Sequence, residues 1–122
     1  MRIKTLESEF SISKVEDYSQ IDITKEFVFT GRTDEEYSLI CPTGLVPANT
    51  LEREDGWRML RFQGILELSM IGVLSRISNV LASNNIGLCG ISTYNTDYIL
   101  VYEDQLEDAL RVLAENGYEI VE

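Results

Sequence analysis

The chain has 122 residues, which is the usual size of one domain or of two very small ones. Hydrophobic residues make up 44% of the chain, which is enough for a packed core and too many for a disordered protein. Acidic residues outnumber basic residues by 21 to 10, which gives a formal net charge of -11. Because this charge repels phosphate backbones and anionic lipid surfaces, we expect no nucleic-acid binding and no membrane binding.

The residue types present disfavour catalysis and metal binding. The chain has no histidine, which is the commonest general base and the commonest metal ligand. Cys41 and Cys89 lie far apart and form no CxxC or Cys/His cluster. The sequence contains no GxGxxG or GK[ST] phosphate loop. We therefore expect a protein that is not an enzyme and that uses no cofactor and no metal.

The sequence shows no targeting or membrane signal. The first residues, MRIKT, are followed by acidic residues rather than by an apolar signal region. No run approaches the roughly 20 apolar residues that a membrane-spanning helix needs. The simplest expectation is a soluble cytoplasmic protein.

The N-terminal half predicts strands but little helix. Residues 9–14 alternate as a strand, and residues 27–30 and 37–40 predict a hairpin. Only residues 16–25 separate the first two strands, which is too few for a four-turn helix and its loops. We therefore expect the first helix of this half to be short or missing, and its second helix to be a brief turn within residues 43–51.

The C-terminal half predicts a complete small domain. Its elements are a strand at 57–62, a helix at about 70–83, strands at 86–94 and 98–102, a helix from near Asp104, and a strand at 118–121. This order predicts a four-stranded antiparallel sheet with both helices on one face. Each helix has one apolar stripe: Val73, Leu74, Ile77, Val80 and Leu81 in the first, and Leu106, Ala109, Leu110, Leu113 and Ala114 in the second.

The ends of these helices carry recognisable signals. Ser69 is placed as the N-cap of the first helix, which Asn84-Asn85 should end. Asp104 and Glu107 have the spacing of a capping box at the second helix. Gly117 is predicted to follow that helix as its C′ residue.

A short internal similarity suggests two related units. Thr33-Asp34 precedes one apolar strand and Thr96-Asp97 precedes another, which is an offset of 63 residues. We therefore expect a tandem of related units in which the first is degenerate.

The loop at residues 64–72 is the first candidate binding stretch. It leads into a helix whose first amides, near Met70, Ile71 and Gly72, have no partners within the helix. Together with the helix dipole, these amides can bind a carboxylate. Ser69 could cap the helix or bind the ligand, and a simple N-cap is the alternative interpretation.

The stretch at residues 92–97 is the second candidate. Asp97 could pair with an ammonium group, while Thr93 and Asn95 offer neutral hydrogen-bonding partners. An amino acid needs donors for its carboxylate and acceptors for its ammonium group, and the two stretches supply both. The alternative interpretation is a hairpin turn rich in turn-forming residues.

The second half resembles the ACT domain family of small ligand-binding regulatory modules. The resemblance rests on the glycine-bearing loop at 64–72, the helix at 73–81 and the run GISTYNTDYILV at 90–101. That run, together with YSLICP at 37–42 and EDGWR at 54–58, is similar to small bacterial tandem-ACT proteins related to the animal CASTOR arginine sensors.

The resemblance implies an α+β, ferredoxin-like fold of tandem βαββαβ ACT units, with antiparallel sheets and helices on one face. It implies a degenerate unit at residues 1–56 and an ACT domain at 57–122. It also implies that an amino acid binds between modules, at positions matching Ser69, Met70, Ile71, Gly72, Thr93, Asn95, Thr96 and Asp97. Because a CASTOR-like sensor has four units and this chain has at most two, a complete site would need a homodimer.

We therefore expect an amino-acid-binding regulatory module that works as a homodimer. Two other functions remain open from the sequence. The first is an interaction or dimerisation module that assembles through sheet edges without a ligand. The second is a minor enzyme activity at the Ser/Thr/Asp cluster.

Overall fold

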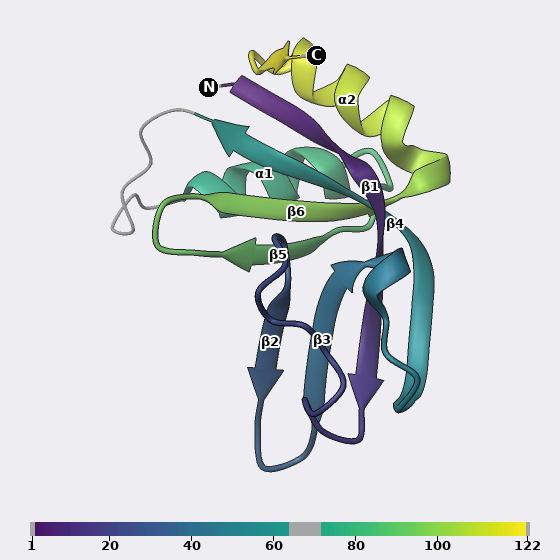
Figure 1. Ribbon diagram of the computed structural model, residues 1–122. Helices are drawn as coiled ribbons and strands as arrows, with labels where there is room; N and C mark the ends of the chain where they lie inside the picture. Colours follow the sequence, from purple (N-terminus) through teal and green to yellow (C-terminus); the bar gives the residue numbers. More distant parts are fainter. Residues whose placement is uncertain (1, 64–71, 122) are drawn as a thin grey trace. The chain divides into compact units, whose positions relative to one another are not determined.

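The structure is a computed structural model that describes residues 2–63 and 72–121 (Figure 1). In chain order its elements are β1 (Arg2–Val15), β2 (Phe29–Arg32), β3 (Tyr37–Pro42), the 3-10 helix η1 (Thr43–Leu45), β4 (Thr50–Gln63), α1 (Val73–Ala82), β5 (Cys89–Ser92), β6 (Asp97–Tyr102), the 3-10 helix η2 (Glu103–Gln105), α2 (Leu106–Glu115) and β7 (Glu119–Val121). None of the helices within the described ranges has the length and apolar character needed to span a bilayer.

The chain divides into two compact units. Unit 1 comprises Met1–Glu7 and Arg58–Glu122, and unit 2 comprises Ser8–Trp57. Both β1 and β4 therefore contribute residues to each unit.

Unit 1 packs both helices against one face of its sheet. Ile99 and Val101, which alternate along β6 and so share a face, lie in the same buried cluster as residues of α1 and α2. The helical members of the cluster are Val73, Ile77, Leu81, Ala109, Val112 and Leu113. The predicted α1 stripe is confirmed, since Leu74 and Val80 also pack on this core. In α2 the prediction of Ala114 is wrong: Ala114 is exposed and Val112 is buried in its place.

The start of α1 is only partly described. Gly72 occupies its N-cap position with a left-handed φ of 84°, which glycine adopts at little cost. Ser69, which the sequence placed as the N-cap, lies outside the described residues. At the other end, Asn85 has a left-handed φ of 61° and the Ile86 amide donates to the Leu81 carbonyl at 3.0 Å. The predicted stop at Asn84-Asn85 is confirmed.

The start of α2 differs from the prediction, whereas its end agrees. Residues 103–105 form η2, so Gln105 is the N-cap of α2 and the helix has no side-chain cap hydrogen bond. The capping box of Asp104 and Glu107 is therefore wrong, because the 3-10 turn moves the cap by one residue. Gly117 has a φ of 94°, and the Tyr118 amide donates to the Leu113 carbonyl at 3.1 Å, which is a Schellman motif.

The sheet of unit 1 contains a strand that the C-terminal half does not supply. Its order is β5-β6-β4-β1-β7, and β7 pairs in parallel with β1 through Ile3 and Ile120. The expected purely antiparallel sheet of four C-terminal strands is therefore corrected. The physical reason is that Ile3 is 0% exposed and belongs to the core of unit 1, so the first residues of the chain are drawn into this sheet. The α+β, ferredoxin-like class of the fold is confirmed.

The strands of unit 2 lie in the order β2-β3-β1-β4. The predicted hairpin is present, with Phe29 opposite Ile40 and Arg32 opposite Tyr37. Residues 16–28 contain no helix and η1 is a single short turn, as the spacing predicted. One buried cluster of unit 2 is small: Val15, Leu39 and Cys41 are buried, with Tyr18, Ile21, Val28, Tyr37, Leu45 and Val46 packed around them. Phe10 of the same unit is also fully buried.

The two units repeat one pattern of secondary structure. The succession β2, β3 and η1 in unit 2 recurs as β5, β6 and η2 in unit 1, with every boundary displaced by 60 residues, as from Phe29 to Cys89. The Thr33 amide donates to Glu36 O at 3.0 Å, and the Thr93 amide donates to Thr96 O at 2.9 Å. The predicted offset of 63 is therefore wrong, because Thr33 corresponds to Thr93, which closes the turn, and not to Thr96.

Candidate functional site

The turn between β5 and β6 holds the second predicted binding stretch. The Thr93 amide and its Oγ1 both donate to Thr96 O, each at 2.9 Å. Across the hairpin, Ser92 Oγ donates to Asp97 Oδ1 at 2.7 Å. These bonds agree with the alternative interpretation of the stretch as a well-formed hairpin turn. Asn95 is exposed at the tip of this turn.

This turn is fastened to the end of strand β4. Thr96 Oγ1 donates a short hydrogen bond to the carbonyl oxygen of Phe62, whose side chain is 1% exposed. Phe62 is the penultimate residue of β4. The carboxyl end of β4 and the turn at 93–96 therefore lie together.

The first turn of α1 lies beside β5. A Cβ at Gly90 would come within 3.0 Å of Leu74 Cδ2, so the missing side chain of this glycine allows the close approach. Figure 1 shows the N-terminal end of α1 and the β5–β6 turn at the same end of unit 1. Of the first predicted stretch, Gly72 is therefore at this end, whereas Ser69, Met70 and Ile71 lie outside the described residues.

A groove follows the exposed side of α1. It has a volume of about 580 Å³ and is lined by Ser75, Ser78, Asn79, Ala82, Ile86, Gly87 and Leu88. The lining residues of α1 recur at helix spacing next to its apolar stripe. A search for catalytic or metal-binding side chains does not detect such a pattern. The lining residues 86–88 lead directly into β5, which stands at the end of the sheet order.

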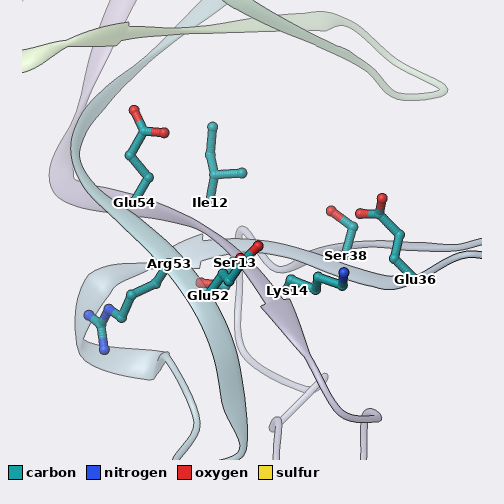
Figure 2. Close-up of a pocket in the computed structure, with 8 residues that line it drawn as sticks. All are labelled: Ile12, Ser13, Lys14, Glu36, Ser38, Glu52, Arg53 and Glu54. Carbon is teal, nitrogen blue, oxygen red and sulfur yellow. The ribbon is translucent and has the colours of Figure 1, made fainter.

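A second cavity lies in unit 2 and was not predicted. Figure 2 shows its lining residues, which come from three neighbouring strands and the turn before β3. It has a volume of about 350 Å³ and is lined by Ile12, Ser13, Lys14, Glu36, Ser38, Glu52, Arg53 and Glu54. Because the strands are far apart in sequence, no local motif could have indicated it.

The two thiols and Ser11 have environments unsuited to nucleophilic attack. Burial raises the pKa of the Cys41 thiol to about 11, against a weak opposing influence of Arg53, and burial also raises the pKa of Cys89. Ser11 is 0% exposed and donates to Asp55, and this hydrogen bond is the main reason that the pKa of Asp55 is lowered. A carboxylate with a lowered pKa is a weak general base, so this pair serves structure.

The described residues contain no group of three or more His, Cys, Asp or Glu side chains placed to hold a metal ion. The Ser92–Asp97 pair has no histidine to relay a proton, since the chain has none. The arrangement at this end of unit 1 can offer hydrogen bonds and charge to a small ligand.

The sequence of the chain matches a model of the ACT domain over residues 52–115, which is more than half of its length. The chain belongs to the ACT domain family. A search of curated proteins gives no match to this ACT protein.

Solved structures share the fold of this ACT protein. Protein Atu0741 from Agrobacterium tumefaciens has a TM-score of 0.85 at 27% identity, covering 98% of this chain and 91% of that one. Aspartokinase alpha and beta subunits give 0.64 at 16% identity, covering 94% of this chain and 96% of that one. The regulatory subunit of aspartate kinase from Thermus thermophilus, in its ligand-free form, gives 0.61 at 12% identity, covering 90% and 93%.

Proposed function

We propose that this ACT protein is a non-catalytic regulatory module of the cytoplasm that binds a free amino acid between modules. The observation that carries the proposal is the family match over residues 52–115, which spans both candidate binding stretches. The relative from Thermus thermophilus is a regulatory subunit of aspartate kinase, which supports a regulatory role for a chain of the same fold.

The ligand would be held at the end of unit 1 where α1 begins. Its carboxylate would accept hydrogen bonds from the helix N-terminus, at Ser69, Met70, Ile71 and Gly72. Its ammonium group would lie near Asp97, with Thr93, Asn95 and Thr96 as neutral partners. Two observations support this placement: Thr96 is bonded to the end of β4, and Leu74 of α1 lies against Gly90 of β5. Asp97 accepts from Ser92 through one oxygen, so the carboxylate keeps capacity for another donor.

Two ACT-like units per chain are part of the proposal, with a degenerate unit at residues 1–56 and a full one at 57–122. The repeat of strand, turn, strand and 3-10 helix at an offset of 60 residues supports it. A homodimer would complete each site. β5 stands at the end of the sheet order, and an edge strand beside a groove is a surface that another chain can cover.

A ligand-free dimerisation module is the second candidate. The observation that favours it lies in the turn between β5 and β6. The hydroxyl groups of Thr93 and Thr96 both donate to backbone carbonyls rather than remaining available to a ligand. In that case the turn would be a structural element, and the edge strand and groove would carry the function.

A thermal-shift screen with each of the 20 amino acids discriminates between the two. A ligand at 100 times its Kd should stabilise the protein by about 2.7 kcal/mol. A rise in Tm with one or a few amino acids supports the sensor. If no amino acid raises Tm at millimolar concentration while light scattering shows a dimer, the sensor function is wrong and the dimerisation module stands.

A further inference from the structure

The cavity of unit 2 is lined by charges of both signs (Figure 2). Lys14 contributes an ammonium group, and Glu36, Glu52 and Glu54 contribute carboxylates. Arg53 also lines the cavity, but its guanidinium is already bound to Asp55, with Nε to Oδ1 at 3.1 Å and NH2 to Oδ2 at 3.3 Å. The charge of Arg53 is therefore compensated outside the set of lining residues.

Lys14 and two of the carboxylates have no partner among the described residues. No carboxylate oxygen of that part of the chain lies within 4.0 Å of Lys14 Nζ, and the side-chain carboxylates of Glu36 and Glu52 take part in no ion pair or hydrogen bond there. Opposite charges thus line one cavity without neutralising one another. Each of them is available to a ligand group of opposite sign.

The strand order places these charged groups on and around the central strand β1. β1 lies between β3 and β4, so Lys14 and Ile12 are central, while Glu36 and Glu52 stand on the two flanks. Lys14 is directly opposite Ser38 in the register of β1 and β3. Neighbouring strands are about 4.8 Å apart, so the flanking strands are separated by about 10 Å. That width, and the volume of about 350 Å³, suit a ligand at the small end of the usual range.

From this juxtaposition of unpaired Lys14 with unpaired Glu36 and Glu52 in one cavity, we propose a second amino-acid site in unit 2. Lys14 binds the carboxylate of the ligand, Glu52 accepts from its ammonium group, and Ile12 contacts its aliphatic part. The excess of carboxylates selects against acidic side chains, so the ligand is an α-amino acid with a neutral or cationic side chain. The site stands independently of the one proposed in unit 1, because it shares no residue with it.

The test is an NMR titration of the 15N-labelled full chain with each of the 20 amino acids. We expect at least one neutral or basic amino acid to shift the amides of Ile12, Lys14 and Ser38 in a saturable way, and glutamate to shift none of them. Blocking either end of the ligand, as a methyl ester or as an N-acetyl derivative, should weaken binding at least tenfold.

Variants separate this site from a general charge effect and from the site of unit 1. Lys14→Met and Glu52→Gln should each weaken binding at least fivefold. Glu26→Gln, which removes an exposed carboxylate of unit 2 outside the cavity, should change it less than twofold, and so should Asp97→Ala.

Four results would overturn the proposal. The first is that no amino acid shifts these amides, and the second is that the methyl ester binds as well as the free acid. The third is that Lys14→Met tightens binding. That result would mean that the Lys14 ammonium group repels the ligand, so the cavity would recognise the ligand only as a cation. Loss of binding in Asp97→Ala would assign the signal to unit 1 instead.

Discussion

Unit 1 and unit 2 share one hairpin pattern but cover it differently. In unit 1, two helices bury a large core against the sheet, and this core counts twelve buried residues within the described ranges. In unit 2, the equivalent positions are covered by the irregular residues 16–28 and by η1, and the buried cluster beneath them consists of Val15, Leu39 and Cys41. The comparison shows that the hairpin is specified by local chemistry, while the helical layer is a separate feature that one unit lacks.

The covering segment of unit 2 is held by polar bonds and aromatic contacts. Asp17 and Asp22 each accept from the backbone and hydroxyl of the residue two positions on, which forms two Asx turns. Tyr18 OH donates to Ser38 O at 2.7 Å. The Tyr18 ring is edge-on to the Tyr37 ring, with 5.3 Å between the two ring centroids. Since residues 16–28 include no α-helix and η1 is a single 3-10 turn, unit 2 has no α-helix N-terminus beside its hairpin. The carboxylate half of the site proposed in unit 1 therefore has no counterpart there.

Core truncations should sharpen this contrast most strongly. Ile77→Ala in unit 1 and Leu39→Ala in unit 2 both remove side chains that are 0% exposed, and such changes cost about 2–5 kcal/mol. We expect the loss of stability in Ile77→Ala to lie in the upper half of that range, because the many buried residues around this position keep the space left by the removed atoms from closing. The loss at Leu39 should lie near its lower end, because partly buried neighbours can close in. Urea unfolding measures both, and equal losses would contradict the contrast between the cores.

The contact between α1 and β5 gives the next effect. Gly90→Val places side-chain atoms where Leu74 now lies, and such overpacking costs about 1–3 kcal/mol. Gly87→Val is the matched control, since a Cβ at Gly87 meets no atom within 4 Å. Urea unfolding of the two variants should separate them clearly. If both lose the same stability, the close approach of α1 to β5 does not depend on Gly90.

The features of the fold that depend on local spacing could be predicted from the sequence, whereas those that depend on long-range pairing could not. The apolar stripe of α1 and the C′ role of Gly117 follow from local spacing, and both are present. The pairing of β7 with β1 joins residues at opposite ends of the chain, and no local pattern carries that information. The capping box failed by a single residue, because η2 precedes α2.

The binding stretches show the same division. The turn at residues 93–97 was recognised from its composition, and its hydrogen bonds confirm a hairpin turn. Its attachment to Phe62 was not predictable, because that bond joins two segments 34 residues apart. The cavity of unit 2 was missed for the same reason, since its charges come together only through strand order.

The smallest effect concerns acid stability in unit 2. The Ser11 hydrogen bond, followed by Arg53, holds the pKa of Asp55 below its ordinary value of 3.8. A carboxyl group with a lowered folded-state pKa stabilises the protein above its unfolded pKa, and this stabilisation is lost as pH falls through the folded value. In Ser11→Ala the pKa of Asp55 should rise, so less stability should be lost on acidification below about pH 4.

An NMR titration of the Asp55 side chain together with urea midpoints against pH measures this effect. Ser8→Ala is the control, because Ser8 is an exposed serine of the same strand. An unchanged Asp55 titration in Ser11→Ala would show that the hydrogen bond does not set the pKa of this group.

The central claim, that unit 1 binds an amino acid beside the β5–β6 turn, is tested most directly by calorimetric titration of the best-binding amino acid. The wild-type chain, Asp97→Ala and the cavity variant Glu52→Gln should be compared. We expect Asp97→Ala to weaken the site of unit 1 at least tenfold, a loss of about 1.4 kcal/mol, with the unfolding transition retained and with Glu52→Gln binding there like the wild type. Undiminished binding by a folded Asp97→Ala would contradict the claim.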